Sequence, residues 1–189
     1  NGEYCKCIRC REIKDTVINT EPILKITKYN SSNGTEIFLS YISLDINNDY
    51  REKILAFGRL RLSKNPGIDL NDKKTKIDDL SECALIRELH VYGNLVSTFN
   101  KNGKDISNNN SQHKGLGKNL LKKMEELSII NGYSRIAVIS GVGVRNYYKK
   151  YGYFLNNGYM IKDLLSKSKN NDNSLLVPIL APILFMIIS

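Results

Sequence analysis

The chain has 189 residues, 41% of them hydrophobic, which predicts a single globular domain with one well-filled core. It carries 28 Lys and Arg against 19 Asp and Glu, and the net charge of +9 favours an anionic partner: an RNA, a phosphorylated cofactor or an acidic membrane surface. No initiator methionine and no secretory leader are visible, so we expect a piece of a longer protein from a reducing compartment.

Three cysteines stand close together at the start of the chain, in CKCIRC (Cys5, Cys7 and Cys10), and Cys83 stands alone in SECALIREL. Closely spaced thiolates joined by one that the fold supplies are typical of a tetrahedral zinc site. We therefore predict a structural zinc held by all four thiolates, with residues 1–15 as a zinc-binding junction segment. The alternative is a set of reduced thiols, with Cys83 a small buried hydrophobe at a strand start.

Four strands are predicted in the first half of the chain. β-Branched and aromatic residues at 23–29 and 36–44 flank the turn cluster NSSNGT and predict a hairpin. Alternating leucine and arginine predict a third strand at 54–63, and we expect these three strands to be antiparallel. CALIRELHVY (83–92) predicts a fourth strand, whose charged centre needs an explanation if the strand is central.

The second half of the chain alternates helices and strands. Residues 100–110 (NKNGKDISNNN) have the composition of a disordered insert, and QHKGLGKNLLKKMEEL (112–127) contains an amphipathic helix that we expect to pack on the sheet. RIAVISG (135–141) predicts a strand, and VRNYYKKYGYF (144–154) predicts a short helix and then a further strand. The predicted order is β-β-β-β-α-β-α-β, an α+β fold with a mostly antiparallel sheet.

Two glycines, Gly115 and Gly117, stand where the long helix begins. Glycine lets the backbone approach a ligand closely, and the free N–H groups of a first helical turn bind phosphate oxygens. The pattern Q-x-x-G-x-G therefore indicates a pyrophosphate site, although a loop that needs one glycine to turn would look the same. No P-loop is present, and the glycines do not directly follow a strand in a βαβ unit, which argues against a dinucleotide fingerprint.

The order of elements, with Q-x-x-G-x-G before the long helix, resembles the GNAT acyltransferase superfamily. The blocks CKCIRCREI, CALIRELHVYG, QHKGLGKNLL and IAVISGVGVRNYYKKYGYFLNNGYM resemble the carboxy-terminal half of the catalytic subunit of Elongator, the tRNA-modifying acetyltransferase. This resemblance implies that residues 16–166 form a cytoplasmic GNAT domain that binds acetyl-CoA. The domain would supply the acetyl group for carboxymethyl-type modification of the tRNA wobble uridine, together with other Elongator subunits.

The resemblance also concerns the metals. It implies a zinc ion at the junction, held by cysteines that match Cys5, Cys7, Cys10 and Cys83. It further implies an upstream radical-SAM half, absent from this chain, with an iron–sulfur cluster and S-adenosylmethionine.

The resemblance implies which residues contact acetyl-CoA: Glu88, Leu89, His90 and Val91 on the fourth strand, and Gln112, Gly115, Leu116, Gly117 and Lys118 in the glycine loop. In GNAT folds the fourth and fifth strands splay apart, so backbone groups left unpaired by the sheet hold the cofactor's amides. Glu88 and His90 are also candidates for side-chain chemistry. The alternatives are a salt bridge for Glu88 and a hydrogen-bonded core position for His90.

Tyr147 and Tyr148 are adjacent, about 100° apart on a helix, so we expect one of them to face the cofactor. Spacing does not settle which. The resemblance favours Tyr148, with Tyr147 in support, and a hydroxyl there would bond the thioester or protonate the leaving thiolate. The alternative is two aromatic core residues. Val144 stands where the family commonly has threonine, a change that we expect to be neutral.

Residues 167–174 (KSKNNDNS) predict a polar linker, and 175–189 (LLVPILAPILFMIIS) form a hydrophobic tail. The tail is shorter than the roughly 20 residues that a membrane-spanning helix needs and contains prolines. A membrane tether or a membrane-surface segment is weighed equally against a strand packed on the core. Two other functions stay open at this point: a stand-alone protein (histone) lysine acetyltransferase, and a non-catalytic module that uses zinc and CoA for assembly.

Overall fold

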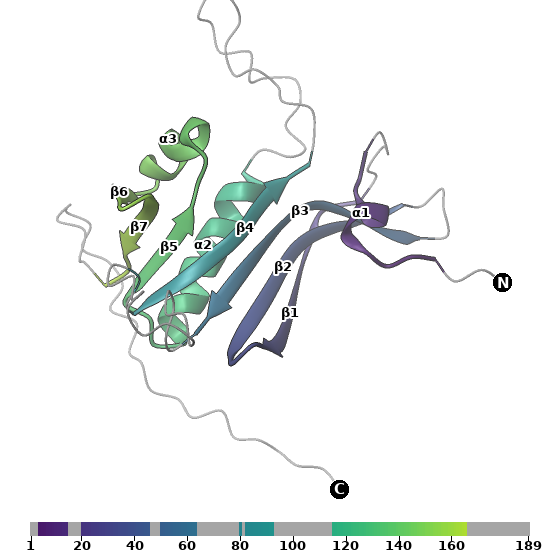
Figure 1. Ribbon diagram of the computed structural model, residues 1–189. Helices are drawn as coiled ribbons and strands as arrows, with labels where there is room; N and C mark the ends of the chain where they lie inside the picture. The colour runs from purple at the N-terminus through teal and green to yellow at the C-terminus, as the bar shows by residue number, and fades with distance from the viewer. Residues whose placement is uncertain are drawn as a thin grey trace, which may run out of the picture.

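The computed structural model describes the following parts of the chain: residues 4–14, 20–45, 50–63, 80, 82–92 and 115–165 (Figure 1). Several predictions from the sequence lie outside the described residues: the insert at 100–110, Gln112, the linker at 167–174 and the tail at 175–189. In the described part of the chain, no helix is long and apolar enough to cross a membrane.

The described elements form one mixed sheet with helices on it. They are α1 (Ile8–Arg11), β1 (Ile23–Ser31), β2 (Gly34–Asp45), β3 (Arg51–Leu62), β4 (Cys83–Val91), α2 (Leu116–Ile130), β5 (Arg135–Ile139), the 3-10 turn η3 (Val142–Val144), α3 (Arg145–Lys149), β6 (Phe154–Asn156) and β7 (Tyr159–Asp163). The strand order is β1-β2-β3-β4-β5-β7-β6, and every neighbouring pair is antiparallel except β4 with β5. The predicted α+β class with a mostly antiparallel sheet is confirmed.

The first and last described elements differ in detail from the prediction. The short helix α1 was not predicted, and it joins the sheet through a bridge between Glu12 and Ile54. The predicted last strand is a hairpin of β6 and β7, in which Asn157 and Gly158 both have positive φ. These two residue types adopt that conformation most readily, so they form a tight turn.

The predicted first hairpin is confirmed. Ser31 of β1 pairs with Gly34 of β2, so the turn consists of Ser32 and Asn33, with φ of 43° and 59°. Positive φ at both central residues gives the turn a twist that matches the flanking strands. Arg61 of β3 donates hydrogen bonds to the carbonyls of Ser31 and Ser32, at 2.7 and 2.6 Å, and so fixes this turn against the third strand.

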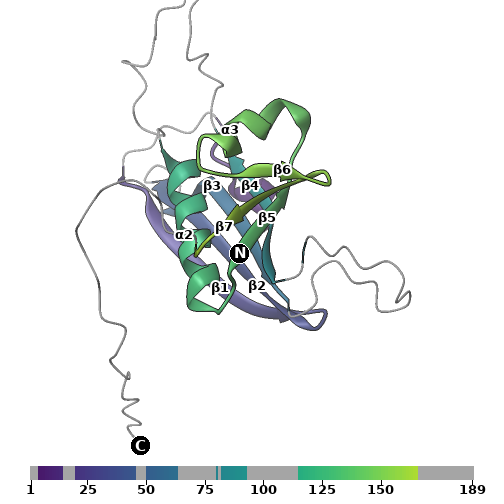
Figure 2. The ribbon, with the colours of Figure 1, turned by 90° about the vertical axis from the view of Figure 1, so that its left-hand side faces the viewer.

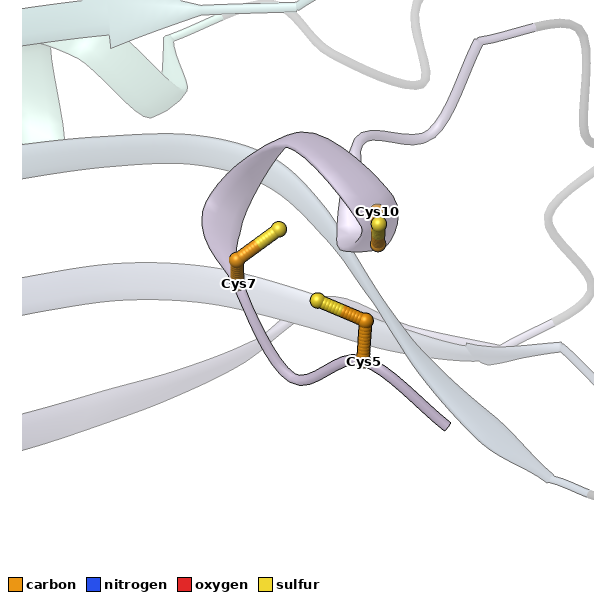
Figure 3. Close-up of side chains that lie close together, drawn as sticks. All are labelled: Cys5, Cys7 and Cys10. Carbon is orange, nitrogen blue, oxygen red and sulfur yellow. The ribbon is translucent and has the colours of Figure 1, made fainter. Parts of the chain in front are cut away.

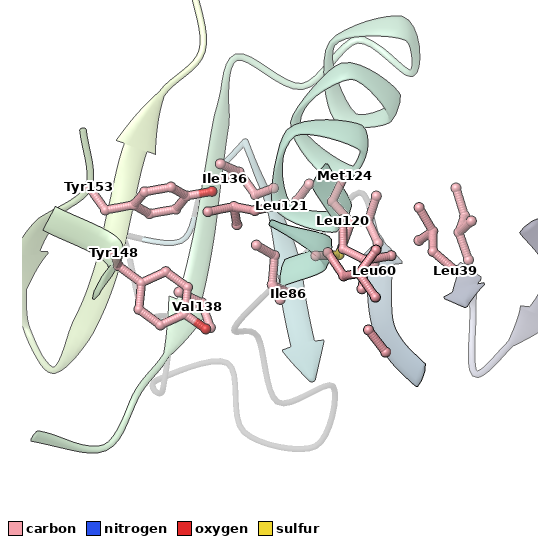
Figure 4. Packing of buried hydrophobic residues seen from close by; sticks show 14 of the residues in the cluster. Leu39, Leu60, Ile86, Leu120, Leu121, Met124, Ile136, Val138, Tyr148 and Tyr153 are labelled. Carbon is pink, nitrogen blue, oxygen red and sulfur yellow. The ribbon is translucent and has the colours of Figure 1, made fainter. Parts of the chain in front are cut away.

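The main core lies between the sheet and α2. In the view from the β6–β7 side, α2 runs along one side of the strands (Figure 2). Its apolar stripe is fully buried against β2, β3, β4 and β5 (Figure 4), through Leu120, Leu121 and Met124 on the helix and Leu39, Leu60, Ile86 and Ile136 on the strands. The apolar positions from which this helix was predicted are therefore the positions that it buries.

A second cluster covers the opposite face of the sheet at one end. There Ile8 of α1 packs against Ile42, Ile54 and Phe57. Ile54 and Leu55 point to opposite faces of β3, since Leu55 belongs to the α2 core. The sheet therefore has an α2 face and an α1 face.

Candidate functional site

The strands β4 and β5 separate halfway along β4. Cys83 to Ile86 pair in parallel with Arg135 to Val138, and within the described strands this pairing does not continue beyond Ile86. On its other side β4 stays paired with β3 as far as Val91. The β3–β4 register shifts beside Arg87, which makes this residue a β-bulge. Within the described strands, one edge of β4 after Ile86 therefore has no strand partner, the separation that the resemblance implied.

The start of α2 lies beside this edge. Gly115 has φ of 93°, in the left-handed region, and a Cβ there would meet nothing within 4 Å, so the backbone conformation alone calls for glycine. The first intrahelical hydrogen bond runs from Asn119 N to Gly115 O, which leaves the N–H groups of Leu116, Gly117 and Lys118 without an intrahelical acceptor. No acidic residue occupies this first turn. These groups and the helix dipole make a site for an anion.

Gly117 is a glycine for a different reason, because two side chains approach its backbone closely. A Cβ built there would lie 3.0 Å from the hydroxyl oxygen of Tyr147 and 3.1 Å from Cγ2 of Val91. Tyr147 comes from α3 and Val91 from the end of β4. Three segments that are far apart in the sequence therefore meet at Gly117, and all three were predicted to contact the same cofactor.

The two tyrosines of α3 have different surroundings. Tyr148 is 6% exposed and points into the core beside Val138 (Figure 4), with its ring 5.6 Å from that of Tyr153. Tyr147 is half-buried and its hydroxyl reaches the glycine loop. Burial raises the pKa of both hydroxyls, and Tyr151 and Tyr148 raise the pKa of Tyr147 further, so both stay protonated at neutral pH. As the tyrosine that faces the glycine loop, the geometry favours Tyr147, whereas the resemblance favoured Tyr148.

The four predicted residues of β4 divide between the two faces of the sheet. Leu89 and Val91 lie on the α2 face, where Leu89 packs against the core and Val91 approaches Gly117. Glu88 and His90 lie on the α1 face, opposite Arg59 and Phe57 of β3. Only the backbone of these two residues can serve a ligand that lies along the α2 side.

Glu88 and His90 are both exposed, and each has a neighbour on β3. Arg59 donates a hydrogen bond to Glu88 at 3.2 Å, so the salt bridge weighed from the sequence is present. The ring of His90 lies 5.7 Å from that of Phe57 and 4.5 Å from that of Tyr92. His90 is therefore not a buried core histidine.

The three amino-terminal cysteines form a cluster at α1 (Figure 3). The sulfur atoms of Cys5, Cys7 and Cys10 lie within 4.8 Å of one another, and all three residues are exposed. Thiolates around one zinc, with Zn–S bonds of about 2.3 Å, stand about 3.8 Å apart, so a small shift would place these three around one ion. A hydrogen bond from the Cys10 backbone lowers the pKa of Cys7 to about 7, and hydrogen bonds with Cys7 and Cys5 raise that of Cys10 to about 11.

Cys83 does not join this cluster, contrary to the predicted four-cysteine site. It is fully buried at the start of β4, among Leu80, Ala137 and Ile161. The cluster lies at the other end of the sheet, because α1 contacts β3 at Ile54, near the residues that pair with the end of β4. Eight residue steps along a strand span about 26 Å, too far for a shared ion. Cys83 matches the alternative reading, a small buried hydrophobe at a strand start.

An acidic residue that the sequence did not single out connects α2 to the segment after α3. Glu125 accepts a hydrogen bond from the hydroxyl of Tyr153 at 3.1 Å and one from Nζ of Lys162 at 2.8 Å. Tyr153 is 3% exposed, and burial followed by the nearby carboxylate raises its pKa. This contact ties the segment after α3, and strand β7, to α2. The only sequence signal was a glutamate on the polar side of the helix pattern.

A parallel pair of strands that separates in mid-sheet, connected by a helix that begins with glycines beside the separation, defines the GNAT class of acyltransferases. No family model matches the chain. The tRNA uridine(34) acetyltransferase of Methanocaldococcus jannaschii is 38% identical over 172 residues, which cover 87% of this chain and 29% of that protein. Elongator complex protein 3 of Drosophila melanogaster is 36% identical over 170 residues, which cover 86% of this chain and 28% of that protein.

A solved structure agrees with these relatives. The structure of Methanocaldococcus infernus Elp3 with an N-terminal deletion superposes with a TM-score of 0.58 at 34% identity, and the match covers 85% of this chain and 35% of that one. The chain therefore belongs to the family of the catalytic acetyltransferase subunit of Elongator and corresponds to its GNAT part. It spans less than a third of the length of the curated relatives that it matches, 29% and 28% for the two named.

Proposed function

We propose that this chain binds acetyl-CoA and supplies the acetyl group with which an Elongator-type enzyme modifies the wobble uridine of tRNA. The observation that carries the proposal is the meeting of Gly117, Val91 and Tyr147 at the end of the stretch of β4 that has no β5 partner within the described strands. The names of the relatives, tRNA uridine(34) acetyltransferase and Elongator complex protein 3, support the choice of tRNA. The net charge of +9 suits an RNA partner as well as a pyrophosphate.

The residues at this meeting point fit acetyl-CoA, which when bound supplies an activated acetyl thioester. The N–H groups of Leu116, Gly117 and Lys118 would bind its pyrophosphate. The free edge of β4 after Ile86 would bind the amides of the pantetheine arm as a neighbouring strand does. Gln112, predicted to contact the same cofactor, lies outside the described residues and stays a prediction.

Tyr147 is our candidate for the hydrogen-bond donor of the site. Its raised pKa keeps the hydroxyl protonated, so it can donate a hydrogen bond to an acyl carbonyl or to a departing thiolate. Tyr148, buried beneath it, holds the ring of Tyr147 in an edge-to-face contact with centroids 5.3 Å apart. Tyr147 is thus the chemical group and Tyr148 its support, the reverse of the order that the resemblance implied.

We further propose that Cys5, Cys7 and Cys10 hold a zinc ion. Thiolates are the ligands that zinc prefers, and the 4.8 Å limit on their separations suits one ion. The fourth position is left to a ligand outside the described residues. The role would be structural, since binding fixes the segment before α1 against the start of β3.

The test is a calorimetric titration of the chain with acetyl-CoA, followed by an assay for CoA released in the presence of tRNA by the longer protein to which this part belongs. We expect binding to one site and release of CoA that depends on tRNA. Absence of acetyl-CoA binding by the folded chain would refute the proposal. Acetyl transfer to a histone-tail peptide without any need for tRNA would favour the stand-alone lysine acetyltransferase instead.

The remaining predictions about partners concern the longer protein. Contact with other Elongator subunits rests on the names of the relatives alone. The cytoplasmic location and the membrane contact of residues 175–189 stay predictions, since the tail lies outside the described residues.

A further inference from the structure

The α1 face of the sheet carries a row of aromatic rings that the cofactor site does not use. The row crosses three strands through Phe38, Phe57 and His90 and ends at Tyr92. Successive ring centroids are 5.6, 5.7 and 4.5 Å apart. Phe57 is 6% exposed and forms the base of the row, whereas His90 is exposed at the surface. We call Phe57, His90 and Tyr92 the aromatic platform.

Arginines surround the aromatic platform on the same face. Arg59 stands beside Glu88, and Arg87 and Arg61 both donate to the same oxygen of Glu36, at 2.9 and 3.2 Å. Glu36 and Glu88 are thus each bound to at least one guanidinium, and half of the Arg87 side chain (49%) stays exposed. The face offers aromatic rings with arginine side chains beside them.

We propose that the aromatic platform binds an unpaired base of the acceptor RNA, by stacking on the ring of His90 with the inclined ring of Tyr92 at its edge, and with Arg59 and Arg87 next to the phosphates. This inference rests on the proposed function and adds a position for the acceptor RNA. Sheet faces with exposed aromatic rings bind single-stranded RNA by stacking, and arginines beside them contact the backbone. A lysine-bearing peptide fits less well, because the carboxylates of Glu36 and Glu88 that would attract it are already paired.

The aromatic platform lies on the same stretch of β4 as the proposed cofactor site. Side chains alternate along a strand, so His90 is on the α1 face and its neighbours Leu89 and Val91 are on the α2 face. The same stretch of β4 has no β5 partner within the described strands. A base on the α1 face and a cofactor along the unpaired edge would therefore contact the same stretch of β4, separated only by its backbone.

The test compares two RNAs of equal length: a labelled anticodon stem-loop with unpaired uridines and a fully paired duplex. His90→Ala should weaken stem-loop binding by at least roughly fivefold, the loss expected for one stacked base. His90→Phe, which keeps a flat ring, should bind the stem-loop within about twofold of the parent. Phe154→Ala removes another exposed aromatic ring, on the edge strand β6 at the far side of the sheet from β1, and serves as the matched control.

Unchanged stem-loop binding by His90→Ala would overturn the inference, and so would an equal loss in His90→Phe, since that would point to the ring nitrogens instead of stacking. An equal loss for the duplex would also overturn it, because it would indicate a charge effect alone. The same variants are titrated with acetyl-CoA. If the parent binds no acetyl-CoA, the proposed function fails, while the RNA comparison still decides the platform.

Discussion

Replacing Gly117 with alanine tests the cofactor site with the smallest change available. The new Cβ would stand 3.0 Å from the Tyr147 hydroxyl and 3.1 Å from Val91 Cγ2, whereas ordinary contacts are 3.4 to 4 Å. Tyr147 must therefore move by a few tenths of an ångström. Alanine in a helix is favoured over glycine by about 1 kcal/mol, which offsets much of the strain, so we expect the free energy of unfolding to change by less than about 1 kcal/mol.

Acetyl-CoA affinity should respond more strongly than stability. The methyl group occupies the space where the backbone would approach the pyrophosphate and displaces the tyrosine beside it. We expect a loss of roughly tenfold, about 1.4 kcal/mol, in a calorimetric titration. A folded Gly117→Ala variant that binds acetyl-CoA as well as the parent would show that this glycine serves packing alone.

A pair of glycines provides the control for backbone strain. Gly115 and Gly132, at the two ends of α2, both have positive φ, and a Cβ on either would meet nothing within 4 Å. Alanine at each should lower the free energy of unfolding by about 1 to 2 kcal/mol, the cost of the left-handed region. Only Gly115→Ala should also weaken acetyl-CoA binding. Equal binding by both variants would separate the glycine loop from the cofactor.

Glu125→Leu should lower the free energy of unfolding by about 1 to 3 kcal/mol in urea denaturation, because the buried hydroxyl of Tyr153 loses its acceptor; no loss would show that the contact is not formed in solution. A hydrogen bond from Lys25 lowers the pKa of Glu52, so its contribution to stability is full above its unfolded pKa near 4.5 and is lost as pH falls further. The stability difference between the parent and Glu52→Gln should therefore shrink between pH 6 and pH 3, and a constant difference would contradict the assignment. Cys83→Ser should leave the zinc content unchanged in elemental analysis, because this residue lies in a separate cluster; loss of zinc would restore the four-cysteine site.

Features with a local cause could be predicted from the sequence. The first hairpin follows from a short run of residues that tolerate positive φ, and Ser32 and Asn33 adopt it. The helix α2 follows from its apolar period. The glycine pair indicated the right place in the fold, although its members have separate causes: conformation at Gly115 and a close approach at Gly117.

Features that depend on the assembled sheet could not be predicted. The four-cysteine prediction for Cys83 used spacing, and spacing does not say which end of β4 lies near α1. The choice between Tyr147 and Tyr148 depends on how α3, a helix of five residues, sits on the core. One turn of helix contains too few residues for its sequence pattern to show which side faces the core. The aromatic platform, likewise, needs the register of β3 against β4, which pairs Phe57 with His90.

The short β4–β5 pairing has a consequence for the mechanics of the molecule. It joins a four-stranded part, β1 to β4, to a three-stranded part, β5 to β7, through residues 83–86 and 135–138. Local opening is easiest where few backbone hydrogen bonds have to break, so within the described sheet this junction is a natural line of flexing. A ligand that contacts the end of β4, the start of α2 and α3 acts as a brace across it. Binding at the site would then reduce the motion of the two parts of the sheet relative to each other, including at residues that the ligand does not contact.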